Sequence, residues 1–128
     1  MTIYLFGNQD HAQDNIAFIA ADKLKKQNPK LRFITVKPNQ DLPFENEAQV
    51  IILDAVDGID KITLITQENI DKIQLPPRFS AHDFDLGFQL KYLKKLGKIK
   101  KFTIIGLPMN GKIDYKKLEK LISSPTQL

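Results

Sequence analysis

Among the acidic and histidine residues of this sequence, we single out Asp14, Asp54 and His82 as a set that could bind a transition metal or transfer a proton. Two carboxylates and one imidazole form an oxygen, oxygen and nitrogen ligand set. Such a set suits zinc, nickel, manganese or iron and leaves positions open for substrate or water. The chain contains no cysteine, which excludes thiolate metal sites, disulfides and a thiol nucleophile. The sequence therefore directs attention to metal-assisted or acid–base chemistry by these three residues.

Asp54 follows directly on Val50-Ile51-Ile52-Leu53, a run of four bulky apolar residues. A run of this kind is typical of a strand that is buried on both faces inside a parallel sheet. Open α/β sheets bind their ligands at the carboxyl ends of such strands. A carboxylate there needs a partner, because burying a bare charge is costly. We therefore take Asp54 as the expected centre of the active site.

The other two residues stand at the starts of expected helices. Asp14 precedes a helix, where an acid is often only a cap or a partner of the helix dipole. His82 lies in Ser80-Ala81-His82-Asp83, which has the spacing of a capping box, and a histidine there is often structural or exposed. The capping role also explains Ser80 better than a nucleophilic role does. The spacing alone does not decide between these interpretations and a shared site.

The elements that must position these residues alternate between strands and helices. The expected strands cover residues 3–6, 31–36, 50–55, 61–65 and 102–105, and the last of them is ended by Gly106-Leu107-Pro108. The expected helices carry apolar faces made of Ile16, Ile19, Ala20 and Leu24, then Leu86, Leu90, Leu93 and Leu96, and finally Leu118, Leu121 and Ile122. Asn28-Pro29, Gly97 and Asp114 provide the stop and cap signals of these helices.

This order predicts a single α/β domain over residues 1–128. The fourth strand is expected to run antiparallel at an edge, because a parallel crossover needs roughly a dozen residues and the gap after the third strand is shorter. The expected architecture has three layers, α/β/α, around a five-stranded mixed, mostly parallel sheet of the phosphorylase/hydrolase-like kind.

The composition favours an ordinary soluble protein, with 42% apolar and 27% charged residues. No apolar run reaches the ~20 residues of a membrane helix, and the first residues lack the features of a signal peptide, so a cytoplasmic location is expected. The net charge is +4, which permits an acidic partner without requiring one. Part of this charge lies in a basic run that is either a solvated helix end or a docking surface for an acidic partner: Lys91, Lys94, Lys95, Lys98, Lys100 and Lys101.

Four short motifs, in this order, resemble those of the hydrogenase maturation endopeptidases. They are Gly7-Asn8 with Asp14, Ile51-Ile52-Leu53-Asp54-Ala55, Ser80-Ala81-His82-Asp83, and Ile104-Ile105-Gly106-Leu107-Pro108. The resemblance implies that Asp14, Asp54 and His82 contact nickel. It also implies the substrate, which is the large-subunit precursor of a [NiFe] hydrogenase with nickel already inserted. The protease removes a short C-terminal extension from that precursor, and no nucleic acid or membrane takes part.

The resemblance implies a mechanism without a nucleophile on the enzyme. The metal would position the peptide and would polarise the scissile carbonyl or activate water, and the carboxylates of Asp14 and Asp54 are the catalytic groups, one of them a possible base. This sequence departs from the family at several places. Ala81 stands where the family has proline, and Val36-Lys37-Pro38-Asn39 occupies the region of its glycine- and threonine-rich segment.

Three alternatives remain open at this point. The first is a non-catalytic, metal-dependent binding or assembly module on the same fold. The second is a receiver-like phosphoacceptor domain with Asp54 as the acceptor, although no lysine precedes Pro108 as that reading would require. The third is a scaffold in which the acids are incidental.

Overall fold

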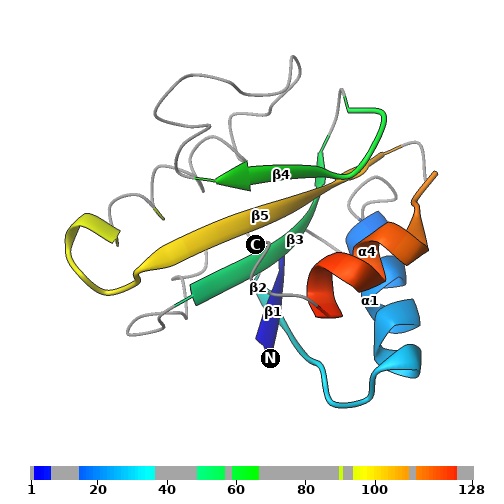
Figure 1. Cartoon of the computed structure of the whole chain (residues 1–128), viewed down its shortest axis with the longest axis horizontal. Helices are drawn as coiled ribbons and strands as arrows, with labels where there is room; N and C mark the ends of the chain where they lie inside the picture. Colours follow the sequence, from blue (N-terminus) through cyan, green and yellow to red (C-terminus); the bar gives the residue numbers. More distant parts are fainter. Residues whose placement is uncertain are drawn as a thin grey trace.

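Five strands form one mixed sheet in the order β2-β1-β3-β5-β4 (Figure 1). This computed structural model describes residues 2–6, 15–36, 49–56, 59–66, 90, 94–109 and 112–123. The strands are β1 (Thr2–Phe6), β2 (Arg32–Val36), β3 (Gln49–Val56), β4 (Thr63–Thr66) and β5 (Lys101–Pro108), and the helices with defined bounds are α1 (Asn15–Gln27) and α4 (Tyr115–Ser123). The mixed, mostly parallel five-stranded sheet predicted from the sequence is confirmed.

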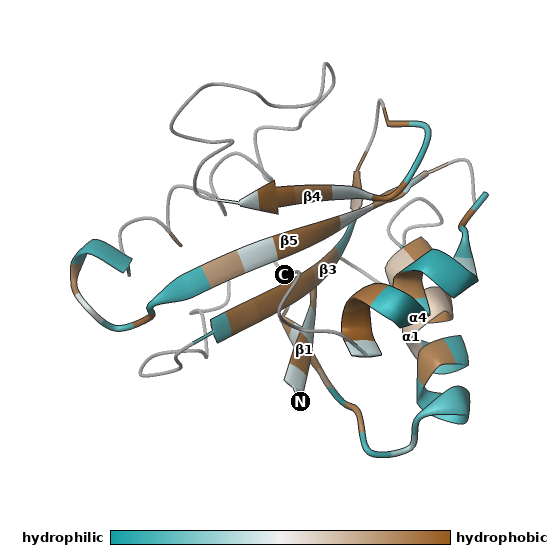
Figure 2. Ribbon diagram, viewed as in Figure 1, coloured by the Kyte–Doolittle hydropathy of each residue, from teal (hydrophilic) through white to brown (hydrophobic). Residues whose placement is uncertain are grey.

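The two long strands β3 and β5 form the middle of the sheet. They pair in parallel over their full length, from Gln49 opposite Lys101 to Val56 opposite Pro108. Every residue after the first is buried in both strands, and the apolar colour continues along most of each ribbon (Figure 2). Because a strand covered on both faces needs no polar alternation, the apolar run before Asp54 predicted this strand correctly.

The edge strand β4 runs antiparallel to β5, with Thr63 opposite Gly106 and Thr66 opposite Thr103. This confirms the predicted direction and edge position. The order 2-1-3-5-4 also differs from the 2-1-3-4-5 order of flavodoxin-like folds, to which receiver domains belong. The receiver-like alternative is therefore wrong.

The helices α1 and α4 cover one face of the sheet (Figure 1). The buried residues of α1 are Ala17, Ala20, Ala21 and Leu24, so the expected inward position of Ile19 is wrong: its side chain is 48% exposed. The predicted and the observed buried faces of α1 both have helical spacing, and the observed face contains three alanines. We attribute the burial of this face to the small size of the alanines, which lets the helix lie closer to the sheet while larger side chains remain at its flanks.

The opposite face packs against a second apolar cluster, which contains Leu90 and Ile99. Leu90 is helical and completely buried on this face, whereas most of the helix expected there lies outside the described residues. The expected inward position of Leu96 is wrong, because its side chain is 53% exposed. The helix ends at this point: Gly97 has a φ of +74°, the left-handed conformation expected for a residue that follows a helix.

The other end signals can be compared directly with the structure. Asp114 caps α4, since its Oδ1 accepts a hydrogen bond of 3.1 Å from the backbone N–H of Lys117. The predicted end of the last strand at residue 105 is wrong, because β5 continues to Pro108. Both neighbours explain the extension: β3 continues beside it to Val56, and β4 pairs with it at Gly106.

Thr103 provides a test of the packing in the middle of β5. Its side chain is completely buried, and within the described part of the chain its Oγ1 has no hydrogen-bond partner. Replacing Thr103 with valine keeps the shape and removes the buried hydroxyl, so T103V should raise the free energy of unfolding by about 1 kcal/mol. Urea denaturation of the two proteins measures the difference. Equal or lower stability of T103V would contradict this account of the hydroxyl.

Candidate functional site

Asp54 is a buried carboxylate near the carboxyl end of β3, with only 3% of its surface exposed. Asp54 alternates along the strand with the same set as Val50, Ile52 and Val56, which belong to the second apolar cluster. Since alternate residues of a strand share one face, Asp54 faces the side of the sheet opposite α1 and α4. The strand thus holds a single acid among apolar residues near its carboxyl end.

The sheet topology places this acid at a switch point. The chain leaves β1 toward β2 on one side, whereas β3 pairs with β1 on the other side. Phe6, the last residue of β1, lies in register with Asp54. In open α/β sheets the crevice outside the carboxyl ends of two such strands is the usual ligand site. The position of Asp54 therefore agrees with the site expected from the sequence.

The neighbours of Asp54 across the sheet are Phe6 on β1 and Gly106 on β5. Phe6 is buried, and Val56, two residues beyond the acid, is completely buried. Charges in such apolar surroundings are screened less than in water, so a cation or a proton near Asp54 would interact with it strongly. This environment favours a carboxylate that binds a cation or exchanges a proton.

Gly106 shapes the site through the absence of a side chain. A Cβ atom at this position would lie 3.2 Å from the carbonyl oxygen of Thr63, 3.2 Å from Cγ2 of Val56 and 3.4 Å from Cδ1 of Ile59. The space beside Asp54 on β5 is therefore filled by groups from β4, from the end of β3 and from the connection between them. The sequence pattern predicted Gly106 to follow the strand, and no role was expected for it. Its signal was a glycine inside an apolar run, which often marks the close approach of another backbone.

The two other predicted ligands, Asp14 and His82, lie outside the described residues. The residue after Asp14, Asn15, begins α1, and β1 ends at Phe6 beside Asp54. Within the described ranges, which leave out both Asp14 and His82, no three acidic or histidine residues are grouped as a metal site would require. The triad of Asp14, Asp54 and His82 consequently stays a prediction.

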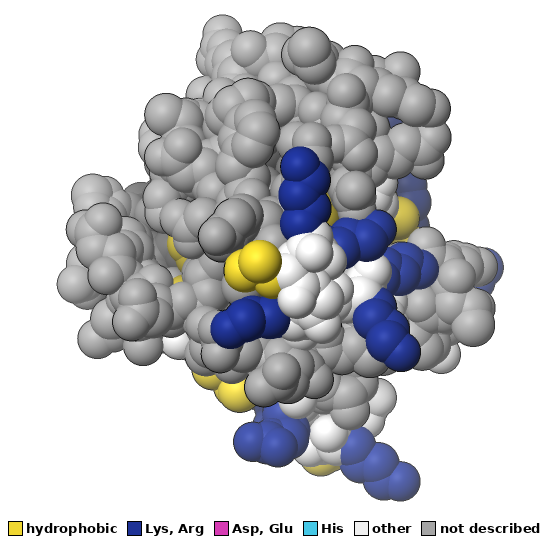
Figure 3. Space-filling view, turned by 90° about the vertical axis from the view of Figure 1, so that its left-hand side faces the viewer, with side chains coloured by type: hydrophobic (Ala, Val, Ile, Leu, Met, Phe, Trp, Pro, Cys, Tyr) yellow, Lys and Arg dark blue, Asp and Glu magenta, His cyan; other side chains and the backbone are white. Residues whose placement is uncertain are grey.

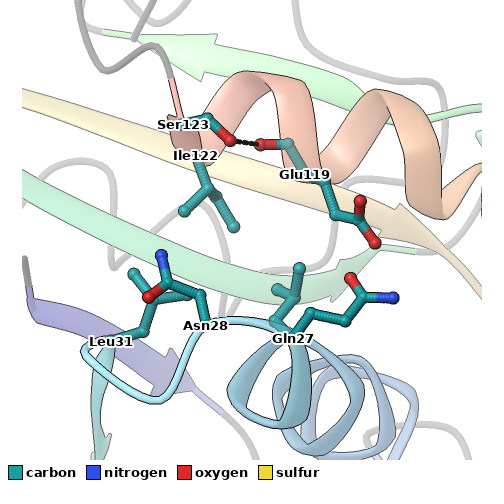
Figure 4. Close-up of a pocket in the computed structure, with 7 residues that line it drawn as sticks. Gln27, Asn28, Leu31, Glu119, Ile122 and Ser123 are labelled. Atoms are coloured by element: carbon teal, nitrogen blue, oxygen red, sulfur yellow. Dashed lines mark hydrogen bonds between the residues drawn. The ribbon is translucent and has the colours of Figure 1, made fainter.

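A cavity of about 230 Å³ lies between the ends of α1 and α4 (Figure 4). Its lining consists of Leu24, Gln27, Asn28, Leu31, Glu119, Ile122 and Ser123. The hydroxyl of Ser123 donates a hydrogen bond of 2.5 Å to the carbonyl oxygen of Glu119 within α4. Because α1 ends here and β2 begins, the cavity lies toward the amino ends of the parallel strands, away from Asp54. It is therefore separate from the candidate site.

The sequence matches the family model described as hydrogenase maturation protease over residues 35–124. This match spans more than half of the chain and includes Asp54 and His82, whereas Asp14 precedes it. The chain belongs to the hydrogenase maturation protease family. No curated protein is similar enough in sequence to be matched.

Solved structures show the same fold at low sequence identity. The hydrogenase maturating endopeptidase HybD from E. coli has a TM-score of 0.61 and 18% identity, and the alignment covers 84% of this chain and 72% of that chain. An endopeptidase from Escherichia coli, solved in solution, has a TM-score of 0.57 and 18% identity, with coverage of 98% and 86%. A hydrogenase 2 maturation peptidase from a Thaumarchaeota archaeon has a TM-score of 0.56 and 16% identity, with coverage of 98% and 96%.

Among the helices within the described ranges, none has the length and apolar character needed to cross a bilayer.

The contacts at Gly106 give a prediction for the site. G106A should lower the free energy of unfolding by about 1–3 kcal/mol, because the new methyl group overpacks a space bounded by a backbone carbonyl, the buried side chain of Val56 and the partly buried side chain of Ile59. Thermal unfolding followed by circular dichroism measures the loss. G97A serves as a comparison, since nothing lies within 4 Å of a Cβ there and its cost comes from the positive φ alone. Stability of G106A equal to that of the unmodified protein would contradict close packing beside Asp54.

Proposed function

We propose that this protein is an endopeptidase that removes the C-terminal extension from the large-subunit precursor of a [NiFe] hydrogenase. The proposal is supported by family membership and by the topology shared with solved maturation peptidases. The observation that carries it is the position of Asp54, a buried acid at the switch point between β1 and β3. We further propose that the reaction takes place in the cytoplasm.

Nickel enters this proposal as part of the substrate. Asp54 supplies a carboxylate oxygen, a donor that suits a divalent transition metal, and its apolar neighbours Phe6 and Val56 would limit competition from water. Asp14 and His82 complete the proposed ligand set. The position of Asn15 at the start of α1 and the end of β1 beside Asp54 support the inclusion of Asp14. For His82 the support comes from the sequence motif that it shares with the family.

The proposed reaction is hydrolysis of one peptide bond. Nickel held by the precursor and by the enzyme would polarise the scissile carbonyl or lower the pKa of a water molecule. A carboxylate of Asp14 or Asp54 would take a proton from the attacking water and later return it to the amine of the departing extension. Hydroxide adds to the carbonyl carbon, the carbon–nitrogen bond breaks, and the products are a carboxylate and an amine. No covalent bond to the enzyme forms at any step.

The decisive test uses Asp54 and the nickel-loaded precursor. D54N keeps the size of the side chain and removes its charge, so it should reduce the cleavage rate at least 100-fold, which is the usual range for loss of an acid–base group. The shift of the precursor on a denaturing gel measures cleavage. D60N is the matched control, because Asp60 is an exposed acid beyond the end of β3, and it should cleave at the normal rate.

The outcomes of this test separate the alternatives. Cleavage by D54N at the rate of the unmodified protein would refute the proposed site. Nickel-dependent binding of the precursor without cleavage, in the unmodified protein itself, would identify a non-catalytic binding or assembly module instead. Circular dichroism of D54N shows whether a loss of activity reflects a loss of folding.

A second prediction concerns the other two proposed nickel ligands, Asp14 and His82. D14N and H82A should each weaken binding of the nickel-loaded precursor, and neither should affect binding of the nickel-free precursor. Co-purification of each variant with the two precursor forms measures this difference. A variant that binds both forms equally well, and as well as the unmodified protein does, would remove that residue from the nickel site.

A further inference from the structure

A basic turn lies at the end of the molecule opposite the candidate site. We define it by residues 94–101, which join the last helical turn on the second face of the sheet to β5. Five of these eight residues are lysines: Lys94, Lys95, Lys98, Lys100 and Lys101. No acidic residue occurs within the turn. Figure 3 shows this end of the molecule, where cationic side chains gather and no described acidic side chain is in view.

The basic turn also exposes an apolar side chain. Leu96 is 53% exposed, and within the described residues only Ile19 is a comparably exposed large apolar residue. Lys95, Lys100 and Lys101 of the same turn are exposed, whereas Lys94 and Lys98 are half-buried. An apolar residue among charged neighbours is the usual arrangement of a protein interface, with an apolar centre and a polar rim. A helix end that is only solvated gains nothing from an exposed leucine.

The backbone of the turn is fixed in three ways. Gly97 adopts a φ of +74° and donates a hydrogen bond of 3.0 Å to the carbonyl oxygen of Lys94. Ile99 is 1% exposed and packs into the second apolar cluster. Lys101 begins β5 and pairs with Gln49. A surface held in this way loses less conformational entropy on binding than a mobile segment would.

The basic turn is distant from the site along the strands. Lys101 lies at the amino end of β5, and Gly106 lies beside Asp54. At a rise of about 3.3 Å per residue, these two positions are roughly 17 Å apart. Figure 1 shows the turn at one end of the long axis, away from the carboxyl ends of β3 and β5. A partner bound at the turn would therefore leave the site free for its substrate.

We propose that the basic turn binds an acidic polypeptide segment of a partner protein, and that this segment contains an apolar residue. The segment is not the C-terminal extension that the enzyme removes. The lysines supply long-range attraction and orientation, and Leu96 supplies the apolar contact. A protein partner is favoured over single-stranded nucleic acid, because residues 94–101 contain no aromatic side chain on which bases could stack. The proposal adds a second docking surface to the proposed function but does not depend on catalysis.

The experiment measures binding of a fluorescent synthetic peptide to the full chain by anisotropy. The probe is a 12-residue peptide with glutamates around a central leucine, and a second peptide carries serine in place of that leucine. The unmodified protein should bind the leucine peptide about tenfold more tightly than the serine peptide, consistent with burial of one apolar side chain. L96S should bind both peptides equally.

The charge is tested with two matched triple variants. K95Q/K100Q/K101Q should weaken binding of the leucine peptide at least tenfold, from three exposed charge contacts. K116Q/K117Q/K120Q removes the same charge from exposed positions of α4 and should bind normally. Both triple variants should cleave the nickel-loaded precursor at the rate of the unmodified protein. Peptide binding therefore tests the docking surface, and cleavage tests the proposed function independently of it.

Three results would overturn the docking proposal. The first is equal binding of the leucine and serine peptides by the unmodified protein. The second is an equal loss in the two triple variants, which would indicate attraction by net charge alone. The third is tighter binding of a 12-nucleotide single-stranded RNA than of the leucine peptide, which would assign the surface to nucleic acid.

Discussion

The parallel register of β1, β3 and β5 is the constraint on which the candidate site depends. It sets Phe6, Asp54 and Gly106 side by side on one face of the sheet. A slip of one residue would turn Asp54 toward α1 and α4, into a cluster made of aliphatic side chains and alanines. Because both faces of β3 are buried, either face would accept its apolar residues. The acid is the residue of this strand that distinguishes the two faces, since a charge in the closed helical layer would be costly.

Gly106 links this register to the edge of the sheet. The carbonyl oxygen of Thr63 and the side chains of Val56 and Ile59 all lie close to where a side chain would begin. The antiparallel strand β4 can therefore lie near the end of β3, and Ile59 can fold over β5. A short connection between β3 and β4 and a glycine in β5 are thus parts of one arrangement. Together they place a backbone carbonyl and two apolar side chains close to Gly106, the neighbour of Asp54 on β5.

The sequence predicted those features that arise from strong local patterns. The apolar run before Asp54 predicted a central strand because a short run rich in β-branched residues is typical of a strand buried on both faces. The short gap after it argued against a parallel crossover. Asp114 and Gly97 predicted the start and end of helices because their roles depend on adjacent backbone groups. Where the outcome depended on packing, prediction failed. Ile19 and Leu96 fit a helical stripe in the sequence. In the structure the alanine face of α1 packs against the sheet instead, and Leu96 lies at the end of its helix.

The candidate site shows the same division. Asp54 could be predicted because it directly follows a distinctive apolar run. The fold confirms that it lies near the carboxyl end of a central strand. Asp14 and His82 are a different case, since their inclusion rests on residue type, motif and family, and the described residues do not reach them. Gly106 had a visible signal, yet its contacts depend on pairing with Thr63 of β4, which lies 43 residues earlier in the chain. Long-range pairing of this kind cannot be read from local sequence, and it is what completes the surroundings of the acid.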